Sequence, residues 1–239
     1  FNADVVFPPT HDTASAIVAI PTTEDCIYIS SGTWSLMGTL LDEPNCSFEG
    51  KNYGFTNEGS YDGKIRYLKN IMGLWIIQSI KKELNDEYSF SQLSEMAEKS
   101  EYSHKIDVDD MTFFAPSSMI DAIKEHLKSN GYPEPQNIGD ILRSVYYGLA
   151  AYYAQTVIDL ERITNKSYSS INIIGGGCRD NYLNKLTAQY TGKTVFAGPV
   201  EATAIGNIVT QMIADNRFHN AEEAKQTIAN SFGIKKVLI

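Results

Sequence analysis

Three consecutive glycines, Gly175, Gly176 and Gly177, constrain this chain more than any other feature of its sequence. They follow an apolar run over residues 171–174 that is typical of a buried strand, and they precede a helical pattern over 182–190. Glycines at such a junction leave the backbone unobstructed, and their N–H groups can point toward an anion near a helix N-terminus. This order of elements favours a nucleotide site, with tight backbone packing as the alternative.

Composition narrows the class of protein. The 239 residues suffice for one large domain. A net charge of −9 disfavours nucleic acid and anionic membranes as partners, because both reward clustered lysine and arginine. No apolar stretch approaches the roughly 18–20 residues that a membrane-spanning helix needs. Three cysteines without metal-binding spacing, Cys26, Cys46 and Cys178, predict a reducing compartment such as the cytoplasm and no protein-built metal site.

Strand and helix periodicities alternate along the chain. Strands are predicted over residues 5–8, 26–31, 34–41, 65–68, 171–174 and 194–197. Helices are predicted over 12–19, 91–99, 118–129, 182–190, 202–214 and 221–231, together with one from residue 71 and a long one over 140–160. The polar, glycine-rich residues 42–62 are predicted to be a loop. A hairpin followed by a β-α-β-α pattern predicts an α/β fold, a mixed sheet flanked by helices.

A second candidate site lies near the start of the chain, at Asp12. In the first turn of a predicted helix, the helix dipole favours an ionised carboxylate. Such a group could accept a proton from a substrate hydroxyl, or it could simply cap the helix. The neighbouring His11 could bind a hydroxyl group or lie in a loop.

Small hydroxyl residues gather in the predicted turn at 30–35, where Thr33 could donate to a phosphate group. An ordinary β-turn explains the same residues, and Trp34 in this turn is expected in the core. Asn70 and Gln78 flank the apolar start of the helix predicted from residue 71. Buried polar groups at these positions would need either a ligand or backbone partners.

Several of these segments together resemble the FGGY family of carbohydrate kinases, in order and over nearly the whole chain: residues 10–16, 31–38, 68–75, 174–178 and 197–202. Trp34 and residues 70–75 are similar to the rhamnulose branch of that family, the rhamnulokinases. The resemblance implies an actin-like (ribonuclease H-like) fold, in which two domains close over ATP and a sugar. It also implies that residues 1–20 are the tail of an amino-terminal domain and the hinge, and residues 21–239 the carboxy-terminal domain.

The resemblance assigns a role to each matching position. Asp12 corresponds to the general base that takes the proton from the sugar 1-hydroxyl. Sugar contacts are expected at His11, Asp12, Thr13 and Asn70, and ATP contacts at Thr33, Gln78, Gly175, Gly176 and Gly177. Magnesium would bridge the ATP phosphates, largely through water, without a dedicated protein cage. The chain departs from the family at residues 57–60, where Ser60 replaces the last glycine of Asn-Glu-Gly-Gly.

The expected partners are ATP, a sugar and a missing amino-terminal domain of the same protein. Without that domain, the chain alone is expected to be inactive, and residues 1–20 are expected to be poorly packed. The alternatives are a non-catalytic nucleotide-binding module, a kinase for a different ketose, and an oxidoreductase that binds a dinucleotide at the glycines. The dinucleotide pattern Gly-x-Gly-x-x-Gly is incomplete, because Asp180 stands where its last glycine belongs.

Overall fold

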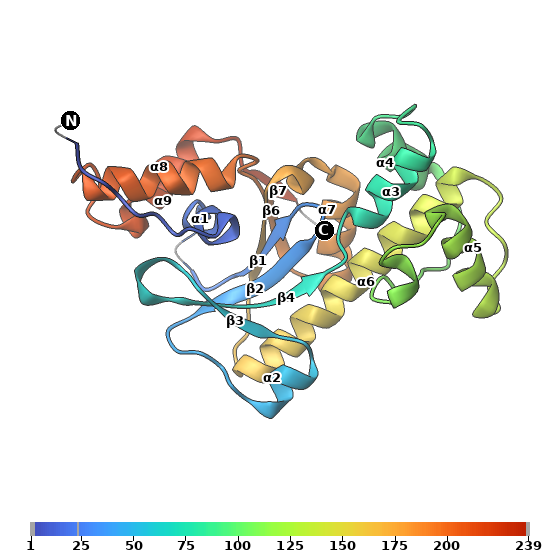
Figure 1. The fold of residues 1–239 in the computed structure, drawn as a ribbon, viewed down its shortest axis with the longest axis horizontal. Helices are drawn as coiled ribbons and strands as arrows, with labels where there is room; N and C mark the ends of the chain where they lie inside the picture. The colour runs from blue at the N-terminus through green and yellow to red at the C-terminus, as the bar shows by residue number, and fades with distance from the viewer. Residues whose placement is uncertain (1–2, 23, 238–239) are drawn as a thin grey trace.

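A mixed sheet of seven strands forms the centre of the computed structural model, which describes residues 3–22 and 24–237 (Figure 1). The strand order is β3-β4-β2-β1-β5-β6-β7. The strands are β1 (Ile27–Ser31), β2 (Ser35–Leu41), β3 (Thr56–Gly59), β4 (Ile65–Ile71), β5 (Ser170–Ile174), β6 (Thr194–Ala197) and β7 (Lys235–Val237). β5 runs parallel to β1 and β6, and the other neighbours are antiparallel. The predicted α/β class with a mixed sheet is therefore confirmed.

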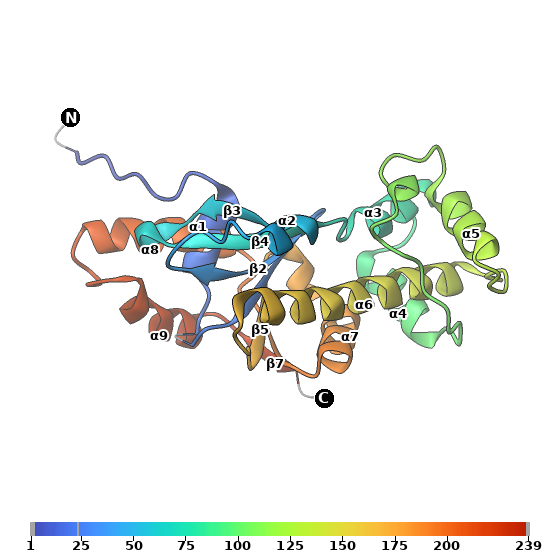
Figure 2. The ribbon, with the colours of Figure 1, turned by 90° about the horizontal axis from the view of Figure 1, so that it is seen from below.

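Helices cover both faces of this sheet (Figure 1). α1 (Asp12–Val18), α8 (Ala202–Ala214) and α9 (Ala221–Ser231) lie on one face, and α6 (Ile138–Thr164) and α7 (Asn181–Thr191) lie on the other. α3 (Trp75–Glu83), α4 (Phe90–Lys99) and α5 (Met119–Ser129) form a group beyond one end of the sheet, at the right of Figure 2. α2 (Phe48–Asn52) is a short helix between β2 and β3. Among the described residues, no helix combines the length and apolar character needed to cross a membrane.

Alternation along the strands divides the core between the two faces. In β1, Ile27 and Ile29 point toward α6 and join the larger apolar cluster, whereas Tyr28 points toward α1 and joins the smaller one. The larger cluster takes more of its residues from α6 than from any other helix, including Leu149 and Tyr153, both fully buried. The sheet is thus covered on both faces, as a sheet with a parallel centre requires.

Burial differs along the described part of the first 20 residues: the segment before α1 is largely exposed, whereas most of α1 is buried. The strand predicted over residues 5–8 is wrong, because this segment pairs with no strand of the described chain, and Val5 and Phe7 are 78% and 83% exposed. The expected poor packing is also wrong from Thr13 to Val18, where every residue is buried. α8 supplies the packing partner: Gly206 lies so close to α1 that a Cβ there would overlap the Ser15 carbonyl oxygen.

Residues 42–62 contain α2 and the edge strand β3, so the prediction of a loop is wrong. β3 is polar and partly exposed, and it lacks the apolar alternation that would reveal a strand. Its pairing with β4 is a tertiary effect that local sequence does not encode. The helix predicted from residue 71 begins only at Trp75, because β4 continues through Asn70 to Ile71.

Candidate functional site

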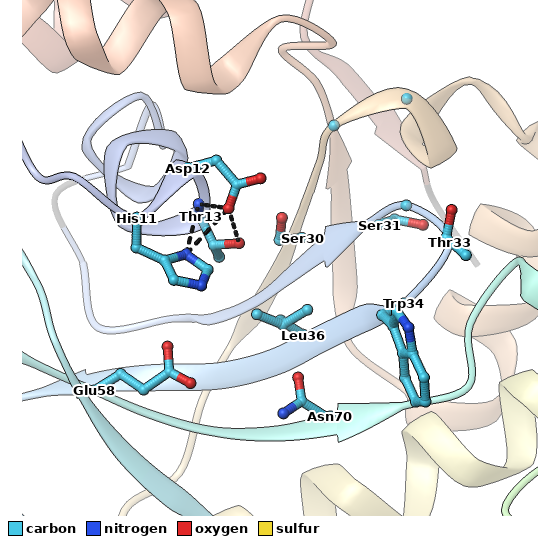
Figure 3. A pocket seen from close by; sticks show the side chains of 13 residues that line it. His11, Asp12, Thr13, Ser30, Ser31, Thr33, Trp34, Leu36, Glu58 and Asn70 are labelled. Atoms are coloured by element: carbon cyan, nitrogen blue, oxygen red, sulfur yellow. Dashed lines mark hydrogen bonds and ion pairs between the residues drawn. The ribbon is translucent and has the colours of Figure 1, made fainter.

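A hollow of about 610 Å³ lies between the start of α1, the β1–β2 turn, β3, β4 and the glycine turn after β5 (Figure 3). Seven of the nine site residues predicted from the sequence line this hollow: His11, Asp12, Thr13, Thr33, Asn70, Gly175 and Gly176. Segments separated by more than 160 positions in the sequence therefore meet around one space. Gln78 and Gly177, the other two predicted residues, do not line it, although each contacts a residue that does, Thr33 and Ser31 respectively.

The start of α1 presents the Asp12 carboxylate to the hollow (Figure 3). His11 is the N-cap, and its Nδ1 accepts a hydrogen bond from the Thr13 N–H at 3.2 Å. Asp12 Oδ1 accepts from the same N–H at 2.6 Å and lies 3.1 Å from His11 Nδ1. Within the described residues no group donates to Asp12 Oδ2, and the side chain is 77% exposed. The carboxylate is held by one oxygen and can accept a proton with the other.

The β1–β2 turn is fastened to the start of α3. The Trp75 N–H donates to the Thr33 carbonyl oxygen at 2.9 Å, and Thr33 Oγ1 donates to Gln78 Oε1 at 3.1 Å. Gln78 therefore reaches the hollow only through Thr33. Trp34 is 41% exposed and lines the hollow, so its expected place in the core is wrong. The adjacent strand β2 begins at Ser35, which turns the Trp34 ring toward solvent and Phe114, 6.4 Å away between ring centroids.

The three glycines after β5 have different local roles. Gly175 has φ of +85°, a left-handed conformation that favours glycine. Gly176 has open space where a Cβ would stand, whereas at Gly177 a Cβ would overlap the Ser31 side chain. Within the described chain no backbone acceptor takes the N–H of Gly176 or Gly177. Tight packing therefore explains Gly177. At Gly176, which lines the hollow, the backbone N–H remains available to a ligand.

The α7 N-terminus that follows is occupied by its own cap. Asp180 accepts from the Leu183 N–H at 3.1 Å and from the Tyr146 hydroxyl at 2.5 Å. Burial and the negative charge of Asp180 raise the pKa of Tyr146 well above its ordinary value, so the phenol stays protonated and donates. Any anion in the hollow would thus be bound by the glycine turn rather than by the helix end.

Glu58 is a lining residue that the sequence reasoning did not select (Figure 3). It comes from β3, inside the segment predicted to be a loop. The available signal was its place in residues 57–60, which follow the Asn-Glu-Gly-Gly pattern of the FGGY kinases except at Ser60. The described residues contain no group of three or more His, Cys, Asp or Glu side chains that could hold a metal ion.

The fold and the hollow together indicate the class of protein. The mixed sheet flanked by helices is an actin-like ATPase fold. Xylulose kinase from Rhodospirillum rubrum superposes with a TM-score of 0.66 over 94% of this chain and 44% of that chain, at 14% identity, a likeness of fold alone.

The family follows from the sequence. A model of the C-terminal domain of the FGGY family of carbohydrate kinases matches residues 27–214, and the chain belongs to this family. It is 43% identical over 236 residues to rhamnulokinase of Halalkalibacterium halodurans, a match over 99% of this chain and 50% of that protein. It is 44% identical to rhamnulokinase of Oceanobacillus iheyensis, over 97% of this chain and 49% of that protein. The chain therefore spans about half the length of these relatives, and the family leaves the oxidoreductase alternative without support.

Proposed function

We propose that this chain forms the carboxy-terminal wall of an ATP-dependent kinase that transfers the γ-phosphate of ATP to the 1-hydroxyl of L-rhamnulose. One observation carries the proposal: the Asp12 carboxylate and the glycine turn at Gly175 and Gly176 face the same hollow (Figure 3). The relatives with 43–44% identity are named rhamnulokinase, which favours rhamnulose over other ketoses.

In this proposal Asp12 accepts the proton of the sugar 1-hydroxyl through Oδ2. His11, Thr13 and Asn70, which also line the hollow, bind the other sugar hydroxyls. Phosphoryl transfer requires mainly positioning and charge stabilisation, and its loose transition state needs little prior deprotonation of the nucleophile. A positioned carboxylate is therefore an adequate base.

The nucleotide lies at the opposite side of the hollow. Thr33 contacts a phosphate once its hydroxyl hydrogen turns from Gln78 Oε1 toward the hollow, and the free N–H of Gly176 donates toward the nucleotide. Gly175 allows the turn to adopt its left-handed conformation. Gly177 acts through packing against Ser31, which keeps the turn close to β1.

Magnesium fits this site as an ion held mainly by phosphates and water. Asp12 would contact such an ion only through one of its water molecules, so that Oδ2 stays free for the sugar proton. When bound, it would neutralise charge on the transferring phosphate.

We further propose that residues 1–20 belong to the tail of an amino-terminal domain and the hinge, and residues 21–239 to the carboxy-terminal domain. The amino-terminal domain is the expected partner, and the 77% exposure of the Asp12 side chain leaves room for its contacts. The chain alone should then be inactive; a turnover above about 1 s⁻¹ with rhamnulose would contradict this. A cytoplasmic location is supported by the three cysteines, all of which are free thiols.

Asp12→Asn in the full-length protein tests the function. We expect kcat to fall by roughly 10²- to 10⁴-fold, because the general base is lost, with ATP affinity unchanged. Asp86→Asn is the matched control, since Asp86 is exposed, lies outside the hollow and has a left-handed backbone that asparagine tolerates. Rhamnulose-dependent ATP hydrolysis in a coupled assay is the measurement. An Asp12→Asn protein with a kcat within threefold of the parent would rule out Asp12 as the general base, whereas a parent without ketose-dependent turnover would favour the alternative, a non-catalytic nucleotide-binding module.

A further inference from the structure

Glu58 lines the hollow, but the function proposed above assigns it no role. It lies on the edge strand β3, across the hollow from the start of α1 (Figure 3). His11 and Glu58 lie at one end in this view, and Thr33 at the other. Glu58 therefore faces the end assigned to the sugar, away from the phosphates that its negative charge would repel.

An ion pair with Arg66 holds the Glu58 carboxylate in place. The two residues are cross-strand partners in the β3–β4 pair. Arg66 Nη2 lies 2.8 Å from Glu58 Oε2, and Arg66 Nε donates to the Gly59 carbonyl oxygen at 3.0 Å. Arg66 is only 1% exposed, and a buried guanidinium requires such a partner. The arginine thus holds both the side chain and the backbone of β3 in place.

Only one oxygen of Glu58 serves this ion pair. Oε2 is buried against Arg66, while the side chain as a whole is 29% exposed. No donor in the described part of the chain bonds to Oε1. An oriented carboxylate oxygen without a donor is an acceptor prepared for a hydroxyl group, and a ketose supplies several.

We propose that Glu58 binds a hydroxyl group of the ketose and contributes to sugar specificity, and that Arg66 is the positioning residue that orients it. This inference rests on the proposed function. The competing explanation is that Glu58 serves only as the counterion of the buried arginine. The two explanations differ in what a shortened carboxylate would do.

Glu58→Asp in the full-length protein separates them, because it keeps the charge beside Arg66 but withdraws the oxygens by one methylene. We expect the ketose KM to rise roughly 10-fold, the value of one charge-assisted hydrogen bond, with kcat and the ATP KM within about twofold of the parent. Glu43→Asp is the matched control, since Glu43 is exposed and does not line the hollow. Mono-deoxy ketoses add a direct test: removal of the hydroxyl bound by Glu58 should make the parent and Glu58→Asp equal.

Arg66→Lys tests the positioning role, because lysine keeps the charge but loses the planar fork. If Arg66 acts through Glu58, the double variant raises the ketose KM no more than the stronger single variant does. Thermal unfolding of each variant separates lost stability from lost sugar binding.

A ketose KM within twofold of the parent in a folded Glu58→Asp protein would overturn the inference alone. An equal rise in the ATP KM would also overturn it. A parent protein without any ketose-dependent turnover would overturn the proposed function, and this inference with it.

Discussion

The two faces of the central sheet differ in the size of their apolar clusters and in the polar groups that they carry. The face under α6 and α7 carries the larger apolar cluster, in which residues such as Leu149 and Ile171 are fully buried. The face under α1 and α8 carries the smaller cluster and the hollow. Three neighbouring strand residues on this second face also bury polar atoms without partners: Tyr28 Oη, Arg66 Nη1 and both amide atoms of Asn172.

Unpaired buried polar atoms cost stability, and the α6 face has them too, at Tyr67 Oη, Arg143 Nε and Asn184 Oδ1. Burial raises the pKa of Tyr28 and keeps this phenol neutral at any ordinary pH. We infer that the α6 face chiefly provides stability, whereas the α1 face also holds the charged and polar groups that line the hollow. Substitutions on the two faces should therefore change different measurements.

Gly206→Ala should produce the largest effect on the α1 face. The new Cβ would overlap the Ser15 carbonyl oxygen, which belongs to the backbone and cannot rotate away. We expect a loss of about 3 kcal/mol, confined to the contact between α1 and α8. Hydrogen exchange should accelerate over residues 12–20 while α6 stays protected. Gly233→Ala is the control, because open space surrounds that position; equal acceleration in α6 would show that the two faces unfold as one unit.

Adjacent glycines offer a sharper comparison within the turn after β5. Gly177→Ala should cost about 1–3 kcal/mol in unfolding free energy, because its Cβ would overlap Ser31. Gly176→Ala should leave stability unchanged but raise the ATP KM, on the order of 10-fold, because its methyl group would enter the hollow. Denaturant unfolding and steady-state kinetics on the full-length protein measure the two effects. A reversed pattern would place the nucleotide elsewhere.

Elements with strong periodicity could be predicted from the sequence. α8 and α9 have the predicted bounds, and the β1–β2 hairpin forms around the predicted turn. The site could be predicted for a different reason. Its residues lie in segments that resemble one family, so Asp12 and Gly176 could be assigned to one site without coordinates.

The remaining elements depend on tertiary contacts that short-range patterns do not contain. β3 is polar and becomes a strand by pairing with β4, which places Glu58 in the hollow. β7 is an edge strand of three residues, Lys235–Val237, with no apolar alternation, and it was not predicted. Packing of α1 against α8 joins segments about 190 residues apart, and local periodicity cannot reveal that contact.

Tyr153→Phe should change the α6 face without changing catalysis. The Tyr153 hydroxyl lies 2.6 Å from Ser35 Oγ in a buried contact, and burial raises the pKa of Tyr153 to about 12. Its removal leaves the Ser35 hydroxyl unpaired, at a cost of about 1–2 kcal/mol in unfolding free energy. Tyr190→Phe is the control, since Tyr190 is exposed. If the ketose or ATP KM moved more than threefold, the separation between the faces would fail at the β1–β2 turn.

Glu161→Gln should give the smallest effect, one that depends on pH. Burial favours a raised pKa for Glu161, but hydrogen bonds from Lys193 at 2.7 Å and from the Tyr168 N–H at 2.9 Å outweigh it and hold the pKa below its ordinary value. A lowered folded-state pKa stabilises the protein above the unfolded pKa of about 4.3, and this contribution disappears as the pH falls through the folded value. The substitution should therefore cost no more than about 1 kcal/mol at pH 7 and almost nothing near pH 3.

Thermal unfolding of the parent and Glu161→Gln proteins across this pH range measures the difference, with Glu43→Gln as a control at an exposed carboxylate outside any ion pair in the described chain. A gap that closes on acidification would show that the end of α6 gains stability from an ionised pair as well as from its apolar cluster. A gap that stays constant would instead assign the loss to packing around residue 161. The α6 face would then depend on apolar burial alone, and its contrast with the polar α1 face would be stronger than we propose.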